Sequence, residues 1–182
     1  IGGIEIITDI GGITPVAAFR DGVVDYIGIG GSVASWIRDD ATLGPQLRAT
    51  DEFVVHYYGF DTTRPPFDDV RVRLAFAKAV DWARLARLAG EPVAHSMVPD
   101  GIPGGGSEDY RPAYDPAAAR DLLADAGYPG GAGLPPIALV SNGYGYEEGV
   151  AADLEASLGI DVAVELYDFA NYLGLRGTPW AP

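Results

Sequence analysis

Residues 57–81 read YYGFDTTRPPFDDVRVRLAFAKAVD, and the order of residue types in this stretch decides the fold around it. An aromatic run ends at two adjacent prolines, which fit neither the middle of a sheet nor the interior of a helix. Asp68 or Asp69 then caps a helix, because a carboxylate at that position accepts hydrogen bonds from free amides and suits the helix dipole. The stretch therefore predicts a strand end placed close to a helix start.

The predicted helix carries a single apolar stripe. Its apolar residues are spaced three and four apart, at Val72, Ala75, Phe76, Ala79 and Val80. Residues with this spacing lie on one face of a helix, so we expect that face to pack on a core. Asp81 can cap a second short helix over residues 82–88, which ends at Gly90.

Strand and helix patterns alternate along the rest of the chain. Patterns of alternating or β-branched residues predict strands at Ile4–Thr8, Val23–Ile29, Glu52–Phe60, 136–142 and 160–168. Capping residues and apolar periodicity predict further helices at 14–22 with Thr14 as the N-cap, from Ser32 onward, at 116–127 directly after Asp115, and at 146–159. Residues 91–113 are expected to form a long loop. The alternation indicates an α/β fold, a mixed sheet flanked by helices, in one domain over residues 1–182.

Charge and composition exclude several classes of function. The formal net charge is −14, with 26 acidic residues and 12 basic ones, and no basic cluster occurs. Nucleic acid is therefore not an expected partner, because polyanion binding needs clustered Lys and Arg. The chain has no cysteine, which excludes disulfides and thiolate metal sites. His56 and His95 have no carboxylate or histidine at ligand spacing, so neither a metal nor a cofactor is expected.

The junction Gly28–Ala34 joins a predicted strand to a helix, where two catalytic or nucleotide motifs are usually found. Val33 replaces the third glycine of a dinucleotide fingerprint, and Ala34 replaces the last glycine of a hydrolase nucleophile elbow. We expect Ser32 to cap the helix rather than to act as a nucleophile. The carboxylate pairs Asp39-Asp40, Asp68-Asp69 and Glu147-Glu148 all fall at predicted helix edges, where capping and solvation account for them.

The loop SNGYGYEE, residues 141–148, is a stronger candidate for a binding site. It follows a predicted strand and precedes a helix, so it lies at the carboxyl end of a sheet strand, where open α/β folds bind ligands. Tyr144 and Tyr146 offer aromatic faces with hydroxyl groups, and Asn142 offers both a donor and an acceptor. A glycine-rich turn whose tyrosines cover a helix end is the alternative interpretation.

Several of these segments, in the same order, resemble the family 5 extracellular solute-binding proteins, the peptide and nickel receptors of bacterial ABC importers. The resemblance covers nearly the whole chain. It is carried by FRDGVVDYIGI, FDTTRPPFDDVRVRLAFAKAVD, SMVPDGIPG, YDPAAARDLLADAGYPGG and LGIDVAVELYDFANYL. Two positions depart from the family pattern. Asp61 replaces the family's asparagine, and no Lys or Arg occurs between Arg120 and Arg176, where dipeptide-binding members carry an arginine.

The resemblance implies one lobe, the C-terminal one, of a receptor whose two α/β lobes close around a ligand. It implies that the strand before the prolines runs to the ligand cleft and ends there. The ligand would be a peptide, an oligosaccharide or a chelate. The other partners would be the second lobe of a longer chain and the membrane subunits of an ABC importer. The residues expected to contact the ligand are Asn142, Tyr144, Tyr146, Asp61, Gly31 and Ser32.

The resemblance also implies where the receptor works and that it is not an enzyme. The receptor would be extracellular or periplasmic and anchored as a lipoprotein in the longer protein, with no catalysis and no bound cofactor. Two alternatives stay open on the sequence. One is a solute-sensing domain of a regulatory protein with the same fold. The other, less favoured, is an α/β hydrolase that uses Ser32.

Overall fold

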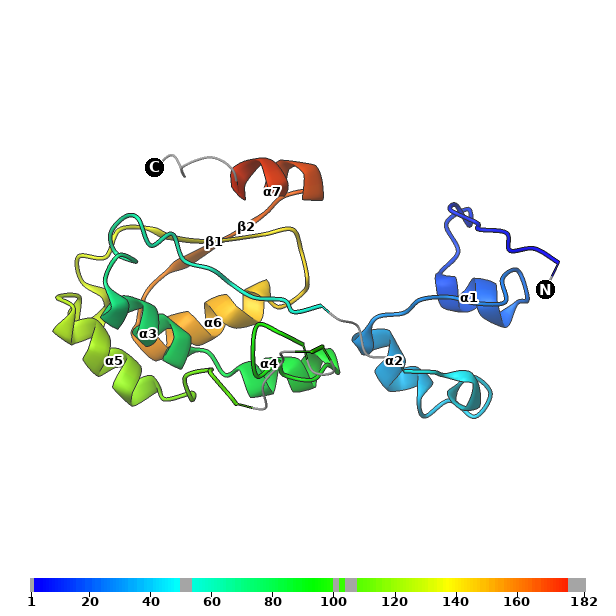
Figure 1. Ribbon diagram of the computed structural model, residues 1–182, viewed down its shortest axis with the longest axis horizontal. Coiled ribbons are helices and arrows are strands. Elements are labelled where there is room, and N and C mark those ends of the chain that lie inside the picture. The colour runs from blue at the N-terminus through cyan, green and yellow to red at the C-terminus, as the bar shows by residue number, and fades with distance from the viewer. Residues whose placement is uncertain (1, 50–53, 100–101, 104–107, 177–182) are drawn as a thin grey trace. The chain divides into compact units, whose positions relative to one another are not determined.

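The computed structural model describes residues 2–49, 54–99, 102–103 and 108–176 (Figure 1). The chain divides into two compact units, residues 1–51 and residues 52–182. The larger unit holds the sheet and the candidate site. A single domain over residues 1–182 remains a prediction.

The core of the larger unit forms around α3, Val70–Ala79, which is the helix predicted from the opening stretch. All five residues of the predicted apolar stripe are buried. Asp69 caps the helix by accepting a hydrogen bond from the amide of Arg71 over 2.8 Å. Helix α3 packs against α5, Pro116–Asp125, which Asp115 caps in the same way through the amide of Ala118.

The sheet of this unit consists of two parallel strands, β1 (Ile137–Ser141) and β2 (Val162–Leu166). Helix α6, Glu147–Leu158, connects them and packs against both, so the three elements form a βαβ unit. Helices α3, α5 and α6 lie on the same side of the sheet in Figure 1. This arrangement confirms the predicted α/β class.

The remaining elements of the larger unit are α4 (Trp82–Ala89), η2 (Pro129–Gly131) and α7 (Phe169–Arg176), of which α4 follows the predicted capping signals. Asp81 caps α4 through the amide of Arg84, and Gly90 ends that helix in the left-handed conformation. Asp168 accepts from the amide of Asn171 over 3.0 Å at the start of a helix that the sequence analysis does not predict.

The smaller unit contains α1 (Pro15–Arg20), α2 (Gly31–Ile37) and a 3-10 turn, η1 (Gly44–Gln46). Thr14 caps α1 as predicted. The prediction that Ser32 caps α2 is wrong, because the helix begins one residue earlier and Gly30 is its N-cap.

Three predicted strands are absent from the described residues: Ile4–Thr8, Val23–Ile29 and the described part of Glu52–Phe60, which is 54–60. The residue types favour extended backbone, but a strand also needs a neighbour to satisfy its amides and carbonyls. The side chains of Ile4 and Tyr26 are both 86% exposed, so no neighbouring segment covers them. Local composition is therefore not sufficient for these segments to form strands.

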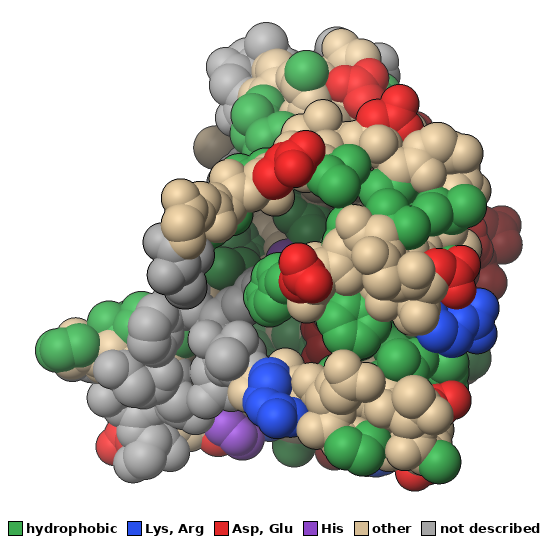
Figure 2. Space-filling model, turned by 90° about the vertical axis from the view of Figure 1, so that its right-hand side faces the viewer, with side chains coloured by type: hydrophobic (Ala, Val, Ile, Leu, Met, Phe, Trp, Pro, Cys, Tyr) green, Lys and Arg blue, Asp and Glu red, His purple; other side chains and the backbone are tan. Residues whose placement is uncertain are grey.

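The surface reflects the acidic composition. On the face shown in Figure 2, acidic side chains are widely spread, basic ones are few, and hydrophobic ones are exposed in several places. None of the helices in the described part of the chain has both the length and the apolar character needed to cross a membrane.

Candidate functional site

The carboxyl ends of β1 and β2 meet at one edge of the sheet. Ser141, the last residue of β1, is paired with Leu166, the last residue of β2. The amide of Tyr167 extends this pairing by donating to the carbonyl oxygen of Ser141 over 2.9 Å. Ligands of open α/β sheets bind at such an edge. The loop of residues 142–146, which follows β1, is therefore the candidate site.

Glu147 organises this loop from the first position of α6. Its side chain is buried, with only 3% exposed. One carboxylate oxygen, Oε1, accepts from the hydroxyl of Ser141 at 2.5 Å and from the amide of Tyr144 at 2.8 Å, and Oε2 accepts from the amide of Gly145 at 2.8 Å. The hydroxyl oxygen of Ser141 in turn accepts from the amide of Gly143 at 3.1 Å. A single carboxylate thus fixes both ends of the loop.

Two glycines give the loop the conformation that this network needs. Gly143 and Gly145 have φ angles of 86° and 90°, in the left-handed region that is strained for residues with a side chain. These turns direct successive amides inward, where the carboxylate accepts them. The Asn-Gly-Tyr-Gly sequence is therefore a conformational requirement of the loop.

The electrostatics of Glu147 differ from the sequence-based expectation of a solvated helix edge. Burial raises its pKa, but hydrogen bonds from the hydroxyl of Ser141 and from the amides of Tyr144 and Gly145 outweigh burial. The net result is a pKa below the ordinary value for glutamate. The carboxylate is therefore ionised at neutral pH although it is buried, because the hydroxyl of Ser141 and two amides of the loop donate to it.

Asn142 is the residue of the loop whose hydrogen bonding is incomplete. Its carboxamide oxygen is buried and has no hydrogen-bond partner among the described residues. Most buried polar atoms in proteins are paired, so an unpaired one in a candidate site indicates a group that could bind a ligand. The structure thus adds a specific reason to the sequence-based choice of Asn142.

Tyr144 contributes an aromatic surface beside Asn142. Its side chain is 49% exposed. Its ring packs on that of His56, with centroids 4.2 Å apart and planes tilted by 52°. His56 belongs to the extended segment 54–60, so this contact joins two segments that are far apart in the sequence. Sequence analysis missed this role of His56, because a lone histidine in an extended segment carries no pattern.

Tyr146 has an anchoring position rather than an open one. It packs against the hydrophobic core, and its hydroxyl donates to the carboxylate of Glu91, just after α4. Burial raises its pKa, and the hydrogen bond to Glu91 raises it further. Burial likewise raises the pKa of Tyr58, with the charge of Glu147 adding to the effect, and Tyr58 stacks on Trp82 at 5.7 Å. Tyr58, Trp82 and Tyr146 all pack against the hydrophobic core of the unit.

Asp61 is bound within its own turn. Its carboxylate accepts from the hydroxyl of Thr63 at 2.6 Å, from the amide of Thr63 at 3.0 Å and from Nε of Arg64 at 3.1 Å. The hydrogen bond from the Thr63 hydroxyl contributes most to holding the pKa of Asp61 below its ordinary value. These contacts account for the aspartate without a ligand.

The position of this turn also separates Asp61 from the loop. Segment 54–60 runs from the side of loop 142–146 to the amino end of α3, at the opposite end of the unit (Figure 1). His56 and Asp61 are five positions apart, and an extended chain of that length spans up to about 17 Å. The two prolines therefore lie away from the edge occupied by the loop, and their place at the ligand cleft stays a prediction.

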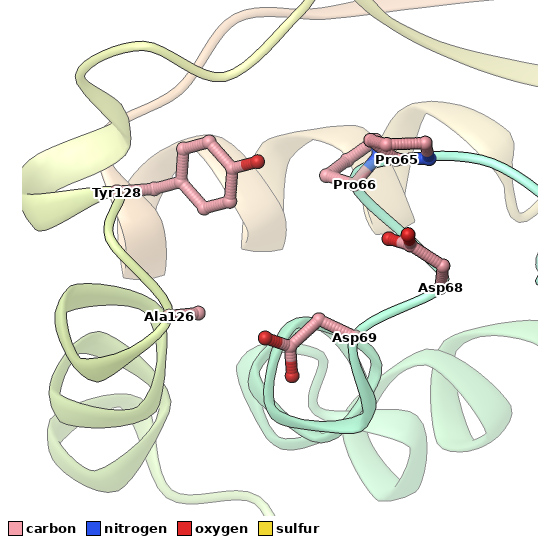
Figure 3. A pocket seen from close by; sticks show the side chains of 6 residues that line it. All are labelled: Pro65, Pro66, Asp68, Asp69, Ala126 and Tyr128. Atoms are coloured by element: carbon pink, nitrogen blue, oxygen red, sulfur yellow. The ribbon is translucent and has the colours of Figure 1, made fainter.

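The prolines line a separate recess of about 400 Å³. Tyr128 and Ala126, beyond the end of α5, face Pro65 and Pro66 across it (Figure 3). Asp68 and Asp69 complete its lining, and the carboxylate of Asp69 is paired with Arg71. The recess is thus the place where the opening stretch packs against α5.

Gly31 and Ser32 lie in α2 of the smaller unit, so their predicted role in ligand contact stays a prediction. In the part of the chain that the structure describes, no group of His, Cys, Asp and Glu side chains has the arrangement of a metal site. The residues that the structure brings together are therefore those of loop 142–146, Glu147 and His56.

Two curated relatives share part of the sequence. A putative ABC transporter peptide-binding protein of Brucella ovis is 28% identical over 173 residues, which cover 86% of this chain and 31% of the relative. The glutathione-binding protein GsiB of Shigella flexneri is 34% identical over 90 residues, which cover 47% of this chain and 18% of the relative. The chain spans about a third or less of the length of these relatives.

Two solved structures share the fold. OppA of Burkholderia pseudomallei has a TM-score of 0.72 at 23% identity, and the match covers 88% of this chain and 34% of OppA. The murein tripeptide binding protein MppA of Escherichia coli has a TM-score of 0.69 at 24% identity, with the same coverage of 88% and 34%. These likenesses confirm the predicted fold, a lobe of the periplasmic-binding-protein type.

The family is shown by the sequence match over most of the chain. Residues 6–178 match the bacterial extracellular solute-binding proteins, family 5, in the middle part of the family's length. The order of the segments from FRDGVVDYIGI to LGIDVAVELYDFANYL agrees with this match. The chain therefore belongs to the family 5 bacterial extracellular solute-binding proteins.

Proposed function

We propose that this chain is a ligand-binding lobe of an extracellular receptor that supplies a peptide or related small solute to an ABC importer. Family membership supports this, as does the Brucella ovis relative, whose name states peptide binding. The family comprises transport binding proteins and is not a family of enzymes. The function therefore rests on reversible binding, and the sensor and hydrolase alternatives are not favoured.

Asn142 is the observation that carries the proposal. A buried polar atom without a partner costs about 1–3 kcal/mol, which a stable protein retains only where something compensates for it. The terminal torsion of asparagine is soft, so the carboxamide can turn toward a bound solute. The hydroxyl of Ser141 and the carboxylate of Glu147 are already bonded to each other and to the loop, and the hydroxyl of Tyr146 is bonded to Glu91. In this proposal the carboxamide of Asn142, whose oxygen has no partner among the described residues, bonds to the solute.

Tyr144 and His56 supply the surface on which the solute rests. Their rings form one aromatic face next to Asn142, and half-exposed tyrosine combines an apolar face with a hydroxyl group. The carboxylate of Glu147 holds the loop in place through the amides of Tyr144 and Gly145. The site is therefore a single wall held by hydrogen bonds rather than a closed pocket.

A second wall must come from the rest of the protein. In this proposal the longer protein carries a second lobe, and ligand favours the arrangement in which both lobes close. Closed pockets bury about 70–90% of a ligand, which one wall cannot do. Membrane subunits of the importer would then receive the solute from the closed receptor. Asp61, Gly31 and Ser32 stay candidates for contacts in that closed form.

Location follows from the same proposal. A receptor of this family works outside the cytoplasm, in the periplasm or at the cell surface. A lipid anchor at the start of the longer protein would hold it close to the importer. Detection of the protein in an extracytoplasmic fraction, with lipid labelling of the longer protein, tests both parts separately.

The binding proposal can be tested on the chain itself. One open wall with a few hydrogen bonds should bind at about millimolar affinity or weaker, near −4 kcal/mol. We therefore choose an NMR titration of the ¹⁵N-labelled chain with trialanine at millimolar concentrations, because chemical shifts report weak binding and name the residues involved. We expect the amides of Gly143 and Gly145 and the side-chain amide of Asn142 to move together with one dissociation constant.

Matched variants give this experiment its control. Asn142→Ala should weaken binding by about threefold to tenfold, since one net hydrogen bond is worth roughly 0.5–1.5 kcal/mol. Ala124→Ser, at an exposed position on α5, should leave the dissociation constant unchanged. A titration in which loop 142–146 does not respond, or responds equally in both variants, would contradict the proposed site.

A further inference from the structure

The edge that carries loop 142–146 has negative charge from several elements. Glu147 begins α6, Glu165 lies in β2, Asp168 precedes α7, and Glu91 follows α4. Their hydrogen bonds in the described structure come from neutral donors. The hydroxyl of Tyr167 donates to Glu165 at 2.9 Å, the amide of Asn171 donates to Asp168 at 3.0 Å, and the hydroxyl of Tyr146 donates to Glu91. Neutral donors stabilise a carboxylate without cancelling its charge.

Positive charge is missing from the segments that form this wall. Residues 49–63 and 121–175 contain no Lys and no Arg. On the adjoining α4, Arg84 is paired with Asp153 at 2.5 Å, and the exposed Arg87 lies in the last turn, before Glu91. The charge of Glu147, Glu165, Asp168 and Glu91 therefore acts on any solute that rests against the loop.

Asn142 alone does not decide which group it binds. A carboxamide has a donor end and an acceptor end, and a rotation of the terminal torsion exchanges them. It could donate to a carboxylate or accept from an amide, a hydroxyl or an ammonium group. Its neighbour Ser141 donates to the ionised Glu147, so a second carboxylate at this place would meet a like charge, with no cation in the loop, β1 or β2 to offset it.

We propose that Asn142 acts as the acceptor in this site, and that the solute group facing it is a hydrogen-bond donor without negative charge. Amides, hydroxyls and ammonium groups fit this description, and a carboxylate does not. The inference rests on the proposed function and adds the chemical class of the solute's facing group. Selection occurs through repulsion of the wrong group as well as attraction of the right one.

Four matched peptides separate these contributions. They are trialanine, its C-terminal amide, its N-acetyl derivative, and the N-acetyl peptide amide. Each is titrated into the ¹⁵N-labelled chain at low salt, and dissociation constants are taken from the amides of Gly143 and Gly145. Comparing acid with amide at a fixed amino end measures the effect of the carboxylate twice and independently.

We expect both amides to bind more tightly than the corresponding acids, by about threefold or more at low ionic strength. The difference between acid and amide affinities should shrink in 0.5 M salt, because charges then interact over only a few ångströms. Asn142→Lys places a cation beside the solute and should reverse the order, so that the acids bind more tightly. Ala124→Lys on α5, at the opposite end of the unit in Figure 1, makes the same change of charge and should leave the order unchanged.

The outcomes distinguish the two proposals. Shifts in loop 142–146 with acids binding as tightly as amides, or more tightly, overturn this inference and leave the binding function intact. If Ala124→Lys reverses the order of acid and amide affinities as Asn142→Lys does, the overall charge of the chain selects the solute rather than Asn142. This result also overturns the inference. The absence of loop shifts with all four peptides overturns the proposed function, and the inference falls with it.

Discussion

The hydroxyl of Ser141 donates a hydrogen bond of 2.5 Å to the carboxylate of Glu147, so the last residue of β1 is bonded to the first residue of α6. The intervening five residues are thereby closed into a loop whose ends cannot separate. Two backbone amides of the loop donate to the same carboxylate. This relationship places Asn142 and Tyr144 at the sheet edge.

Glu147→Gln should loosen the loop and destabilise the protein. Glutamine keeps the size of the side chain but replaces one acceptor oxygen with the NH2 of a carboxamide. That NH2 would face the hydroxyl of Ser141 or a loop amide, each of which is itself a donor. An unpaired buried donor costs about 1–3 kcal/mol, and we expect a loss of stability in that range by urea denaturation. Glu148→Gln is the matched control, because Glu148 is the next residue of α6 and is exposed. Equal losses in the two variants would contradict the role given to Glu147.

The contribution of Glu147 should depend on pH. Its pKa in the folded protein lies below its ordinary value of 4.5, so its stabilising effect is fully present above that value. The effect is lost as the pH falls through the lower folded-state pKa and the carboxylate becomes protonated. The difference in unfolding free energy between the wild type and Glu147→Gln should therefore be largest near pH 7 and smaller at about pH 3. A difference that grows toward acid would show that the carboxylate is not the stabilising form.

Gly131→Ala should destabilise the turn that carries the chain from α5 toward β1. Gly131 has φ 80°, and a Cβ there would collide with Cγ2 of the buried Ile160. Left-handed backbone and overpacking each cost about 1–3 kcal/mol, so we expect a loss of roughly 2–4 kcal/mol. Gly130→Ala provides the control, since its φ is 60° but its Cβ would meet no atom within 4 Å. Thermal denaturation should give a clearly smaller loss for Gly130→Ala, and equal losses would exclude the collision as the cause.

Asp153→Ala should cost more than Arg84→Ala, although the two residues form one ion pair. The carboxylate of Asp153, 14% exposed, accepts from Arg84 at 2.5 Å and from the amide of Asp81 at 2.9 Å. Removing Asp153 leaves that amide unpaired, and we expect a loss of about 2 kcal/mol, against about 1 kcal/mol for the partly exposed Arg84. A double-mutant cycle in urea measures both. If Arg84→Ala costs as much, the amide of Asp81 contributes nothing.

The sequence by itself determined the elements whose signals are local. Caps at Thr14, Asp69, Asp81 and Asp115 were predictable, because a side chain three or fewer residues away satisfies the free amides of a helix start. The buried stripe of α3 and the strands β1 and β2 follow from periodicity in the same way. The loop after β1 was a candidate for the site on its position alone.

Only the tertiary structure decided which segments meet. The segments Ile4–Thr8 and Val23–Ile29 have strand composition but no described neighbour, since pairing depends on residues distant in the sequence. Glu147 was expected at the surface, but it is buried and accepts the hydrogen bonds that hold the loop. The packing of His56 on Tyr144 forms one wall of the site. Asp61 was separated from that wall because its segment runs away from it. The local sequence indicates which secondary structure each residue favours. Contacts between distant segments decide whether its charge is buried and which groups it bonds to.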